Sequence, residues 1–469
     1  MSRPLHIMWF RQDLRLADNP ALRAAADGTA RVLPVFILDD GNAGEWRRGG
    51  ASRWWLHQAL QALDASLDGR LVLLRGRADE IVPRLVAATG AVGVFWNRCY
   101  EPWRIDRDKR IKATLNDAGV RAESSNGSLL WEPWEVLKGD GTAYRVFTPY
   151  YRNGCLAGAP PREPLPAPRD LVHAHVEVPG ALDLDALQLE SPLGWQEMLA
   201  PHWTISETGA RERLDTFVAG GLAGYGEGRD FPAQEHVSRL SPHLHCGTIS
   251  PHQVWHAAGG GAHAEAFRRE LGWREFSHHL LYHFPTLPRG NFQDKFDRFP
   301  WAWESPHIEA WQRGRTGIPF VDAGMRELWR TGFMHNRVRM IAASYLVKNL
   351  LVHWHVGAEW FWDTLVDADL ANNSASWQWV AGSGADAAPY FRIFNPVTQG
   401  RRFDPAGAYV RRWVPELAAL PDRWVHEPWA APTGVLKDAG IAIGADYPAP
   451  VVDLKASREK ALAAFSSLR

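Results

Sequence analysis

The stretch RVLPVFIL, residues 31–38, begins with one charged side chain and continues with seven uncharged residues, most of them apolar. A short apolar run of this kind is typical of a strand that is buried on both faces. Three further runs share this character: HIMWF (6–10), RLVLLRG (70–76) and AVGVFWN (91–97). Helical patterns, as at 52–67 and 79–89, separate the runs. Buried strands that alternate with helices predict a doubly wound α/β domain with a parallel sheet.

The rest of the chain has a different pattern. Prolines at 160, 161, 164, 166 and 168 rule out a regular helix or strand in that region, and we interpret it as part of a long linker. From about residue 200 onward, apolar residues recur every three or four positions, which predicts helices: 209–222, 263–284, 321–332, 336–356 and 357–370. We therefore expect an α/β domain at 1–130, an interdomain linker at 131–199 and an all-helical domain at 200–469.

Composition sets broad limits on the class of protein. The 469 residues carry a formal net charge of −1, so binding of a polyanion would depend on a local basic patch. No stretch is apolar enough to span a bilayer and no signal peptide is recognisable, so we expect a soluble, cytoplasmic protein. Cys99, Cys155 and Cys246 are widely spaced, which argues against disulfides and against a four-cysteine zinc or iron–sulfur site.

Two features of the expected helical domain suit a nucleic acid. Arginines gather in the segments 311–348 and 392–412, and such patches can hold phosphates, although charge runs more often form solvated faces. In ELGWREF, Glu270 and Trp273 lie three apart and share a helix face. A carboxyl group beside an indole can bind and stack on a base, but taken alone the pair is more often structural.

Other polar clusters suit a heterocycle that carries phosphates. MHNRVRM places Asn336, Arg339 and Met340 on one helix face, and YGEGRDFP (225–232) and HVSRLSPHL (236–244) are loop-like segments before helices, where phosphates can meet free backbone N–H groups. His279 and His283 have zinc-ligand spacing. No carboxylate or cysteine motif completes a zinc site, so we interpret these histidines as structural and expect no metal.

Several long motifs together resemble one known family. They are WFRQDLRLADNPAL, YGEGRDFP, SRLSPHL, ELGWREF, RTGIPFVDAGMREL, MHNRVRM, WQWVAGSGADAAPYFRIFNPVTQGRRFDP and DLKASREKALAA. These motifs occur, in order, in the photolyase and cryptochrome family, and the chain looks most similar to the class I cyclobutane pyrimidine dimer photolyases of bacteria. The resemblance implies an N-terminal antenna domain, a linker and a helical FAD-binding domain. It also implies a deoxyribodipyrimidine photo-lyase, in which reduced, anionic FAD repairs a flipped-out dimer in UV-damaged DNA under light.

The resemblance assigns the FAD contacts position by position. The matched residues are Tyr225, Ser238, Leu240, Ser241, Asn336, Arg339, Asp367, Asp369 and Asn373. The first four match contacts to the flavin phosphates and sugar, and Asn373 matches the residue that faces flavin N5. Arg339 and Asp367 would form a charge pair against the ring. An amide at Asn373 should favour reduced flavin over the oxidised form.

Substrate contacts and an electron path follow from the same comparison. Glu270, Trp273, Asn336, Met340 and Trp379 match residues of the dimer pocket, and Arg229, Arg337, Arg392 and Arg402 are candidates for the DNA backbone. Trp377, Trp354 and Trp301 match a triad that carries electrons from the surface to oxidised flavin. In the stretch DLANNSASWQWVAGSG (369–384), we expect Trp377 to face the flavin and Trp379 the substrate from two sides of a turn. Small residues would let this turn approach the cofactor closely.

The sequence departs from the family pattern at three positions: Val237, where a threonine hydroxyl is usual, Phe333, where a tryptophan is common, and Cys246, which replaces a common phenylalanine. None removes a catalytic group, although FAD affinity could suffer. Glu101 and Arg53 are weak pointers to an antenna chromophore, either methenyltetrahydrofolate or 8-hydroxy-5-deazaflavin. We expect a monomer without a protein partner.

The main rival interpretation is a cryptochrome, a light sensor without repair activity. Asn373, the full dimer pocket and the lack of a C-terminal extension argue against it. Repair of the six-four photoproduct would need paired histidines in the pocket, whereas His335 is followed by Asn336. A light-independent nucleotide-binding protein would have to match every motif by coincidence, and the iron–sulfur branch of the family has more cysteines.

Overall fold

The structure is a computed structural model that describes residues 3–387 and 391–468. The chain divides into two compact units. The first comprises Met1–Ala223, Ser238–Pro285 and Asp367–Ala371, and the second comprises Gly224–Val237, Thr286–Val366 and Asn372–Arg469. The helical half expected from residue 200 onward is thus shared between the units. None of the described helices is both long and apolar enough to cross a bilayer.

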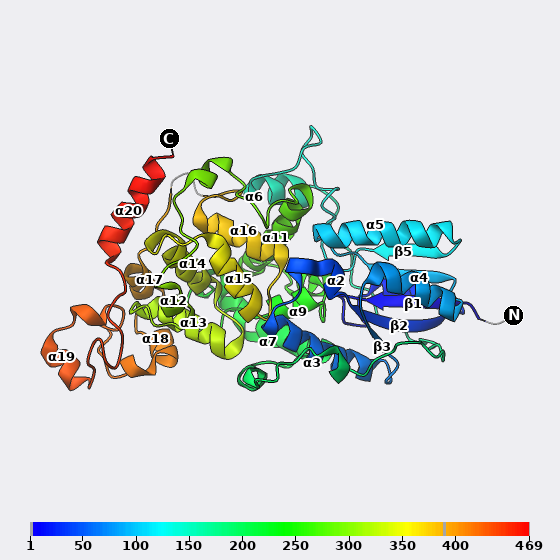
Figure 1. Ribbon diagram of the computed structural model, residues 1–469, viewed down its shortest axis with the longest axis horizontal. Helices are drawn as coiled ribbons and strands as arrows, with labels where there is room; N and C mark the ends of the chain where they lie inside the picture. Colours follow the sequence, from blue (N-terminus) through cyan, green and yellow to red (C-terminus); the bar gives the residue numbers. More distant parts are fainter. Residues whose placement is uncertain (1–2, 388–390, 469) are drawn as a thin grey trace. The chain divides into compact units, whose positions relative to one another are not determined.

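The first unit contains a five-stranded parallel sheet, shown in Figure 1. Its strands are β1 (Leu5–Phe10), β2 (Arg31–Leu38), β3 (Val72–Arg75), β4 (Gly93–Asn97) and β5 (Arg121–Ser125). The strand order is β3-β2-β1-β4-β5, and neighbouring strands are parallel throughout. Strands are added outward from β1 to β2 and β3 on one side, and then as β4 and β5 on the other side, which is the arrangement of a doubly wound sheet. The predicted fold class is confirmed.

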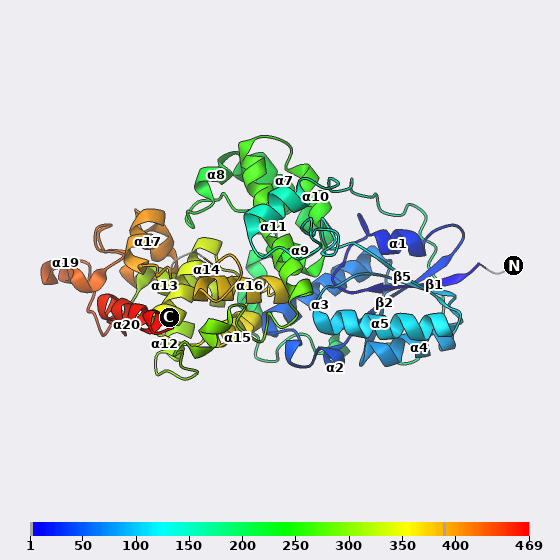
Figure 2. The ribbon, with the colours of Figure 1, turned by 90° about the horizontal axis from the view of Figure 1, so that it is seen from above.

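Helices cover both faces of this sheet. The helices that follow the strands are α1 (Pro20–Ala25), α2 (Asp40–Ala43), α3 (Gly50–Ser66), α4 (Ala78–Thr89) and α5 (Pro102–Asp117). Alternate residues of the central strands, such as Ile7, Trp9 and Leu33, share one hydrophobic core with Val82 of α4 and Ile111 of α5. Figure 2 shows α1 on the opposite side of the sheet from α4 and α5. Burial on both faces explains why these strands read as nearly continuous apolar runs.

β5 was absent from the four strands that we expected. Its sequence, RAESS, is polar, and no residue of the strand is buried. β5 is the edge of the sheet, where one row of backbone groups pairs with β4 and less apolar surface is covered. Hydrophobic runs identify buried central strands better than edge strands of this kind.

The proline-rich linker has no regular element between 156 and 184, as expected, but it pairs locally with the sheet. Val32 forms an isolated bridge with His173, and Leu73 forms one with Leu182. The first unit also contains the helices α6 (Phe147–Pro149), α7 (Glu207–Thr216), α9 (Ser241–Cys246), α10 (Pro251–Ala257) and α11 (Ala262–His283).

The second unit is helical. Its elements are α8 (Tyr225–Gly228), α12 (Ile308–Gln312), α13 (Pro319–Thr331), α14 (Asn336–Ser344), α15 (Trp354–Thr364), α17 (Pro396–Phe403), α18 (Ala408–Trp413), α19 (Thr433–Asp438) and α20 (Leu454–Ser466). α13 packs against α12, α14, α17 and α18. Buried carboxylates fasten this core, because the hydroxyl groups of Tyr409 and Tyr447 each donate at 2.6 Å to Glu327 and Asp322 respectively.

Two predicted helical windows have different limits in the structure. The window 336–356 is broken: α14 passes into a π-helical turn at Tyr345–Asn349, Leu351 has a φ of 52°, and α15 begins only at Trp354. The window 357–370 is broken in the same way, since α15 ends at Thr364 and α16 spans Leu370–Ala381. Apolar periodicity continues through both breaks and therefore could not reveal them.

Candidate functional site

Three tryptophans of the second unit, Trp301, Trp354 and Trp377, are buried. Gly357 follows Trp354 by three residues on α15 and lies on the same helix face. A methyl group on Gly357 would lie 2.1 Å from Cη2 of Trp377, so the glycine lets this ring pack against α15. The ring of His353 lies 5.4 Å from Trp301 and 5.7 Å from Trp354, between centroids. The structure thus gathers the three predicted indoles in one region.

The indole N–H groups of these tryptophans differ. Trp301 donates to the carbonyl oxygen of Val347 at 2.9 Å, and Trp354 donates to the side-chain oxygen of Asn291 at 3.0 Å. The N–H group of Trp377 is buried and has no acceptor within the described residues. A buried donor without a partner costs about 1–3 kcal/mol. The described residues therefore leave the hydrogen-bonding capacity of the Trp377 N–H group unsatisfied.

The stretch that carries Trp377 and Trp379 is a helix, α16, and not the turn that we expected. Residues two apart on a helix point to nearly opposite sides, so the two rings still face different surroundings. Trp377 is 2% exposed, whereas Trp379 is half-buried and donates from its indole to the carbonyl oxygen of Asp386 at 3.1 Å. The small residues act after the helix: a Cβ on Gly384 would lie 2.8 Å from the backbone of Gln378 and Trp379.

Asn373 is one turn before Trp377 on α16. Its side-chain Nδ2 donates to the carbonyl oxygen of Ala358 at 3.0 Å. This bond fixes which end of the amide is the acceptor, and no described residue donates to Oδ1. Asn373 therefore offers one oriented acceptor from a half-buried position.

α14 holds four of the predicted residues. Asn336 is exposed at its first turn, while Arg339 and Met340 are half-buried. The Nε atom of Arg339 donates to the carbonyl oxygen of Met334 at 2.7 Å. Arg337, predicted to bind DNA, pairs with Asp230 at 2.7 Å, which neutralises part of its charge. The predicted ion pair between Arg339 and Asp367 stays a prediction.

In the first unit, Ser241 begins α9 and donates its hydroxyl hydrogen to Asp367 at 2.6 Å. Leu240 is buried just before it, and the hydroxyl oxygen of Ser238 accepts a long hydrogen bond of 3.4 Å from the Leu240 N–H. The carbonyl oxygen of Ser238 accepts from Arg213 at 2.8 Å. The structure therefore brings four predicted contacts, Ser238, Leu240, Ser241 and Asp367, to the start of α9.

Asp369 lies in a cluster that the sequence motifs did not reveal. Its Oδ2 is 3.5 Å from Nδ1 of His245 and 3.6 Å from Nε2 of His278. The other nitrogen of His278 faces the carbonyl oxygen of Arg274 at 3.0 Å, so both ring nitrogens face acceptors and His278 requires both protons. Burial lowers the pKa of His278, but Asp369 outweighs it and raises the pKa above 6.5.

His245 has the opposite character. Arg48 donates to its Nε2 at 3.2 Å, so His245 is neutral and its proton on Nδ1 faces Asp369. Burial accordingly lowers the pKa of His245. For Asp369, burial raises the pKa, but His278 and His245 outweigh it and hold the pKa well below 3.8. Asp369 is therefore an ionised carboxylate in a buried setting.

α11 presents the predicted substrate pair. Glu270 and Trp273 are both half-buried on this helix. The ring of Trp273 stacks on Phe147, with centroids 3.8 Å apart and planes 11° from parallel. One face of the indole is therefore held by the protein, and the ring is fixed in orientation for stacking on its partly exposed side.

The remaining predicted residues are dispersed. Tyr225 is buried, with the guanidinium group of Arg229 5.4 Å from its ring centroid. Arg402 is exposed, while Arg392 is half-buried and accepts at its carbonyl oxygen from Lys348. Lys348 itself is 2% exposed, and no carboxylate among the described residues pairs with it. Burial lowers the pKa of Lys348 to about 7.

The structure shows the surroundings of two of the three residues that depart from the family pattern, Phe333 and Cys246. Phe333 lies under the guanidinium group of Arg339, whose central carbon is 5.2 Å from the ring centroid. Cys246 is buried, burial raises the pKa of its thiol to about 11, and its carbonyl oxygen accepts from Leu14. Val237 carries no hydroxyl, so its own side chain cannot make the hydrogen bond that a threonine could make there.

The two antenna candidates belong to separate ion pairs. Arg53 pairs with Asp40 at 2.8 Å, and Glu101 pairs with Arg104 at 3.1 Å. Within the described residues no hydrogen bond or ion pair joins Arg53 to Glu101. One carboxylate oxygen of Glu101 is buried and has no hydrogen-bond partner among the described residues, so it can accept a hydrogen bond from a ligand.

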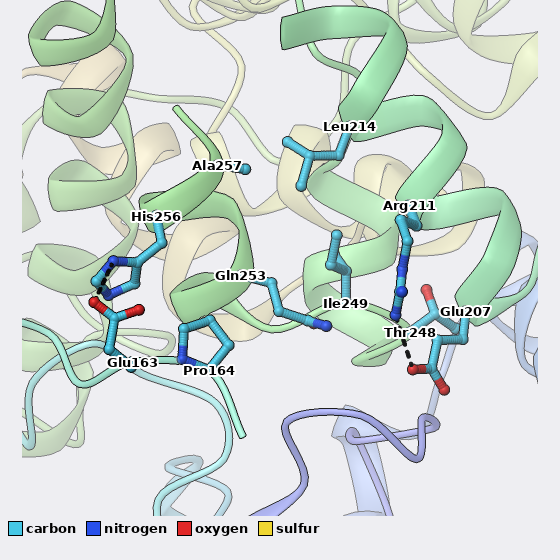
Figure 3. Close-up of a pocket in the computed structure, with 10 residues that line it drawn as sticks. All are labelled: Glu163, Pro164, Glu207, Arg211, Leu214, Thr248, Ile249, Gln253, His256 and Ala257. Carbon is cyan, nitrogen blue, oxygen red and sulfur yellow. Dashed lines mark ion pairs between the residues drawn. The ribbon is translucent and has the colours of Figure 1, made fainter. Parts of the chain in front are cut away.

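The first unit contains a cavity of about 320 Å³, whose lining residues are drawn in Figure 3. Among its polar side chains, His256 lies 3.3 Å from Glu163, and Arg211 pairs with Glu207 at 3.7 Å. None of the predicted site residues lines it. The histidines with zinc-ligand spacing have structural contacts: His279 accepts from the Tyr144 N–H at 3.1 Å, and His283 bonds to the carbonyl oxygen of Pro133.

The helical unit thus holds three buried indoles and an oriented amide, and the other unit carries a doubly wound parallel sheet. Comparison with known proteins shows the family. Residues 6–169 match the DNA photolyase family, and residues 267–467 match the FAD binding domain of DNA photolyase. The chain belongs to the photolyase and cryptochrome family.

The chain is similar both to photolyases and to a cryptochrome of this family. The deoxyribodipyrimidine photo-lyase of Agrobacterium fabrum is 49% identical over 99% of this chain and 98% of its own length. The crystal structure of a bacterial class III photolyase from Agrobacterium tumefaciens has a TM-score of 0.95, with 47% identity, over 100% of this chain and 98% of that chain. Cryptochrome-1 of Arabidopsis thaliana is 37% identical over 98% of this chain and 70% of its own length.

Proposed function

We propose that this protein is a DNA photolyase that uses light to split cyclobutane pyrimidine dimers. The observation that carries the proposal is the 49% identity, over nearly the full length of both chains, to a deoxyribodipyrimidine photo-lyase. When bound in its reduced, anionic form, FAD supplies the light-driven electron that opens the cyclobutane ring. The chain's own residues bind the cofactor, hold the dimer and exclude water.

The described residues fit FAD. The residues that would contact it are those matched from the sequence: Tyr225, Ser238, Leu240, Ser241, Asn336, Arg339, Asp367, Asp369 and Asn373. The free Oδ1 of Asn373 would be suited to accept from a flavin N5–H group, which oxidised flavin lacks. The unpartnered N–H of Trp377 and the ionised carboxylate of Asp369 also fit a polar cofactor.

The dimer would be held by aromatic planes and a carboxyl group. The indole of Trp273, fixed by Phe147, would stack on one pyrimidine, and Trp379, fixed through its N–H, would stack on the other. Glu270 would hydrogen-bond the dimer and steady the charge that develops on it. Asn336 and Met340 would complete the pocket.

Local arginines would bind the DNA backbone, because a protein with a net charge of −1 does not attract DNA as a whole. Arg402 is exposed and Arg392 half-exposed, so these two are the strongest candidates. Arg229 and Arg337 would add charge at the margin, although Arg337 already pairs with Asp230. We propose a cytoplasmic monomer that needs no protein partner.

Two finer assignments remain proposals. Class I was expected from the motifs, whereas the similar crystal structure is described as a class III photolyase, and we propose class III on that likeness. An antenna chromophore, either methenyltetrahydrofolate or 8-hydroxy-5-deazaflavin, would bind the α/β unit near Glu101 and Arg53. The buried, unpartnered oxygen of Glu101 supports its part in this site.

Blue-light repair tests the function. The reduced protein is mixed with an oligothymidine that carries cyclobutane dimers, illuminated, and followed by the return of thymine absorbance, with a dark control. We expect recovery only in the light. Trp273→Ala should weaken dimer binding, whereas Trp329→Ala, at a 50% exposed tryptophan, should not. A flat trace from a yellow protein that light can reduce would instead favour the cryptochrome alternative.

A further inference from the structure

Trp303 has an unusual setting for a tryptophan. It is 59% exposed, which is the highest value among the tryptophans of the described chain. Its ring nevertheless has a fixed partner, because it stacks on His353 with centroids 4.1 Å apart and planes 13° from parallel. Trp303 is therefore too exposed to belong to the hydrophobic core, and its ring is held in place by stacking, unlike a mobile surface side chain.

His353 joins Trp303 to the buried indoles. Its ring lies 5.4 Å from Trp301 and 5.7 Å from Trp354, so one imidazole touches the exposed tryptophan and two members of the predicted triad. Burial lowers the pKa of His353 to about 4, and the ring is therefore neutral at physiological pH. A neutral ring places no positive charge beside an oxidised indole.

Trp301, which the family pattern places at the outer end of the triad, is only 8% exposed. Its N–H group is held by the carbonyl oxygen of Val347 and does not meet water. An indole that has lost an electron carries a positive charge, and burial disfavours a charge strongly. Water at Trp303 would stabilise the same charge and would accept the indole proton.

We propose that Trp303 is the solvent-side electron donor of this protein and extends the tryptophan path through His353 to the surface. The inference rests on the proposed function, because it requires that light oxidises Trp377 when oxidised FAD is bound. Trp303 gives one electron to oxidised Trp301 and so restores that indole. Trp303 then releases its N–H proton to water, and a thiol such as dithiothreitol returns one electron and one proton.

The test compares Trp303→Phe with Trp329→Phe. Trp329 is a matched control because it is 50% exposed and also stacked, on Trp360 at 6.0 Å and 7°. Each purified protein with oxidised FAD is illuminated with blue light and dithiothreitol, and bleaching of the flavin is timed. Flash absorption follows the tryptophan radical, which gives a readout independent of repair.

We expect Trp303→Phe to bleach about tenfold more slowly, because the equilibrium fraction of oxidised indole that reaches the surface should fall by about tenfold, which corresponds to about 59 mV in a one-electron potential. The flash experiment should show a radical that fails to lose its proton, while Trp329→Phe matches the unaltered protein. Equal rates in Trp303→Phe and the unaltered protein, with bleaching lost in Trp301→Phe, would overturn the role of Trp303 and leave the triad intact. An unaltered yellow protein that never bleaches would refute the electron path as a whole, and a protein without FAD would refute the proposed function.

Discussion

Substitution of Gly357 by alanine should destabilise the second unit by crowding Trp377. The new methyl carbon would lie 2.1 Å from Cη2 and 2.5 Å from Cζ3 of that ring, whereas carbon atoms prefer about 3.5–4.0 Å. Trp377 is already packed against Phe361 and Trp311, at 5.0 and 6.2 Å between centroids, so it must shift by more than its surroundings allow. Overpacking of this kind costs about 1–3 kcal/mol, and more when no side chain can move aside.

The gain in helix propensity opposes this cost. Alanine is favoured over glycine inside a helix by about 1 kcal/mol. We take the upper part of the overpacking range because of the 2.1 Å contact, and we expect a net loss of about 2 kcal/mol in the free energy of unfolding. Urea unfolding followed by circular dichroism measures this loss, and FAD content measures the effect on the site.

Gly434 provides the control. It lies in α19, and a methyl group there would meet no atom within 4 Å. Gly434→Ala should therefore leave stability unchanged or raise it by up to about 1 kcal/mol. The reasoning would be refuted if Gly357→Ala were as stable as Gly434→Ala and retained as much FAD.

Two further substitutions test the buried charges. Lys348→Met should raise the free energy of unfolding at pH 6. The folded pKa of Lys348, about 7, lies below the unfolded value of 10.5, so the unaltered protein gains stability as pH rises between these values. The stability difference between Lys348→Met and the unaltered protein, measured by urea unfolding, should therefore shrink as pH rises. Asp369→Asn should cost about 3 kcal/mol by leaving His278 charged and unpaired. Asp369 contributes stability above its unfolded pKa of 3.8, which is lost as pH falls, and His278 contributes below 6.5, which is lost as pH rises through its raised pKa. The Asp369→Asn deficit should therefore be largest between pH 4 and 6.5, and a deficit independent of pH would contradict the ion pair.

The buried core of the α/β sheet was predictable because burial on both faces leaves a strong mark on the sequence. The run at 31–38 became β2 without a change of limits. β5 was missed because an edge strand is stabilised by backbone pairing, and its side chains need not be apolar. The break near Leu351 was missed for a related reason. The apolar residues on either side of it face the same core, so the hydrophobic period continues although the backbone does not.

The predicted site residues were located by matching motifs, and their surroundings came only from the fold. No pattern in the sequence connects Asp369 with His278, which lies 91 positions earlier in the chain, or His353 with Trp303. Contacts of this kind depend on how distant helices meet. A histidine in HLHCG or in FSHHLL is an ordinary helix residue until the fold places a carboxylate beside it.

On α16, the positions of the two tryptophans were predictable from the sequence, but the directions of their side chains were not. The spacing of Trp377 and Trp379 is that of one face of a strand, and the small residues around them favoured a turn. In the helix the same spacing sends one ring into the core, beside Gly357, and leaves the other at a half-buried position where Asp386 holds its N–H. Asn373, one turn earlier, then lies on the side of Trp377. A single short helix can therefore present an amide and an indole in one direction and a second indole in another, and this division follows from the helical period alone.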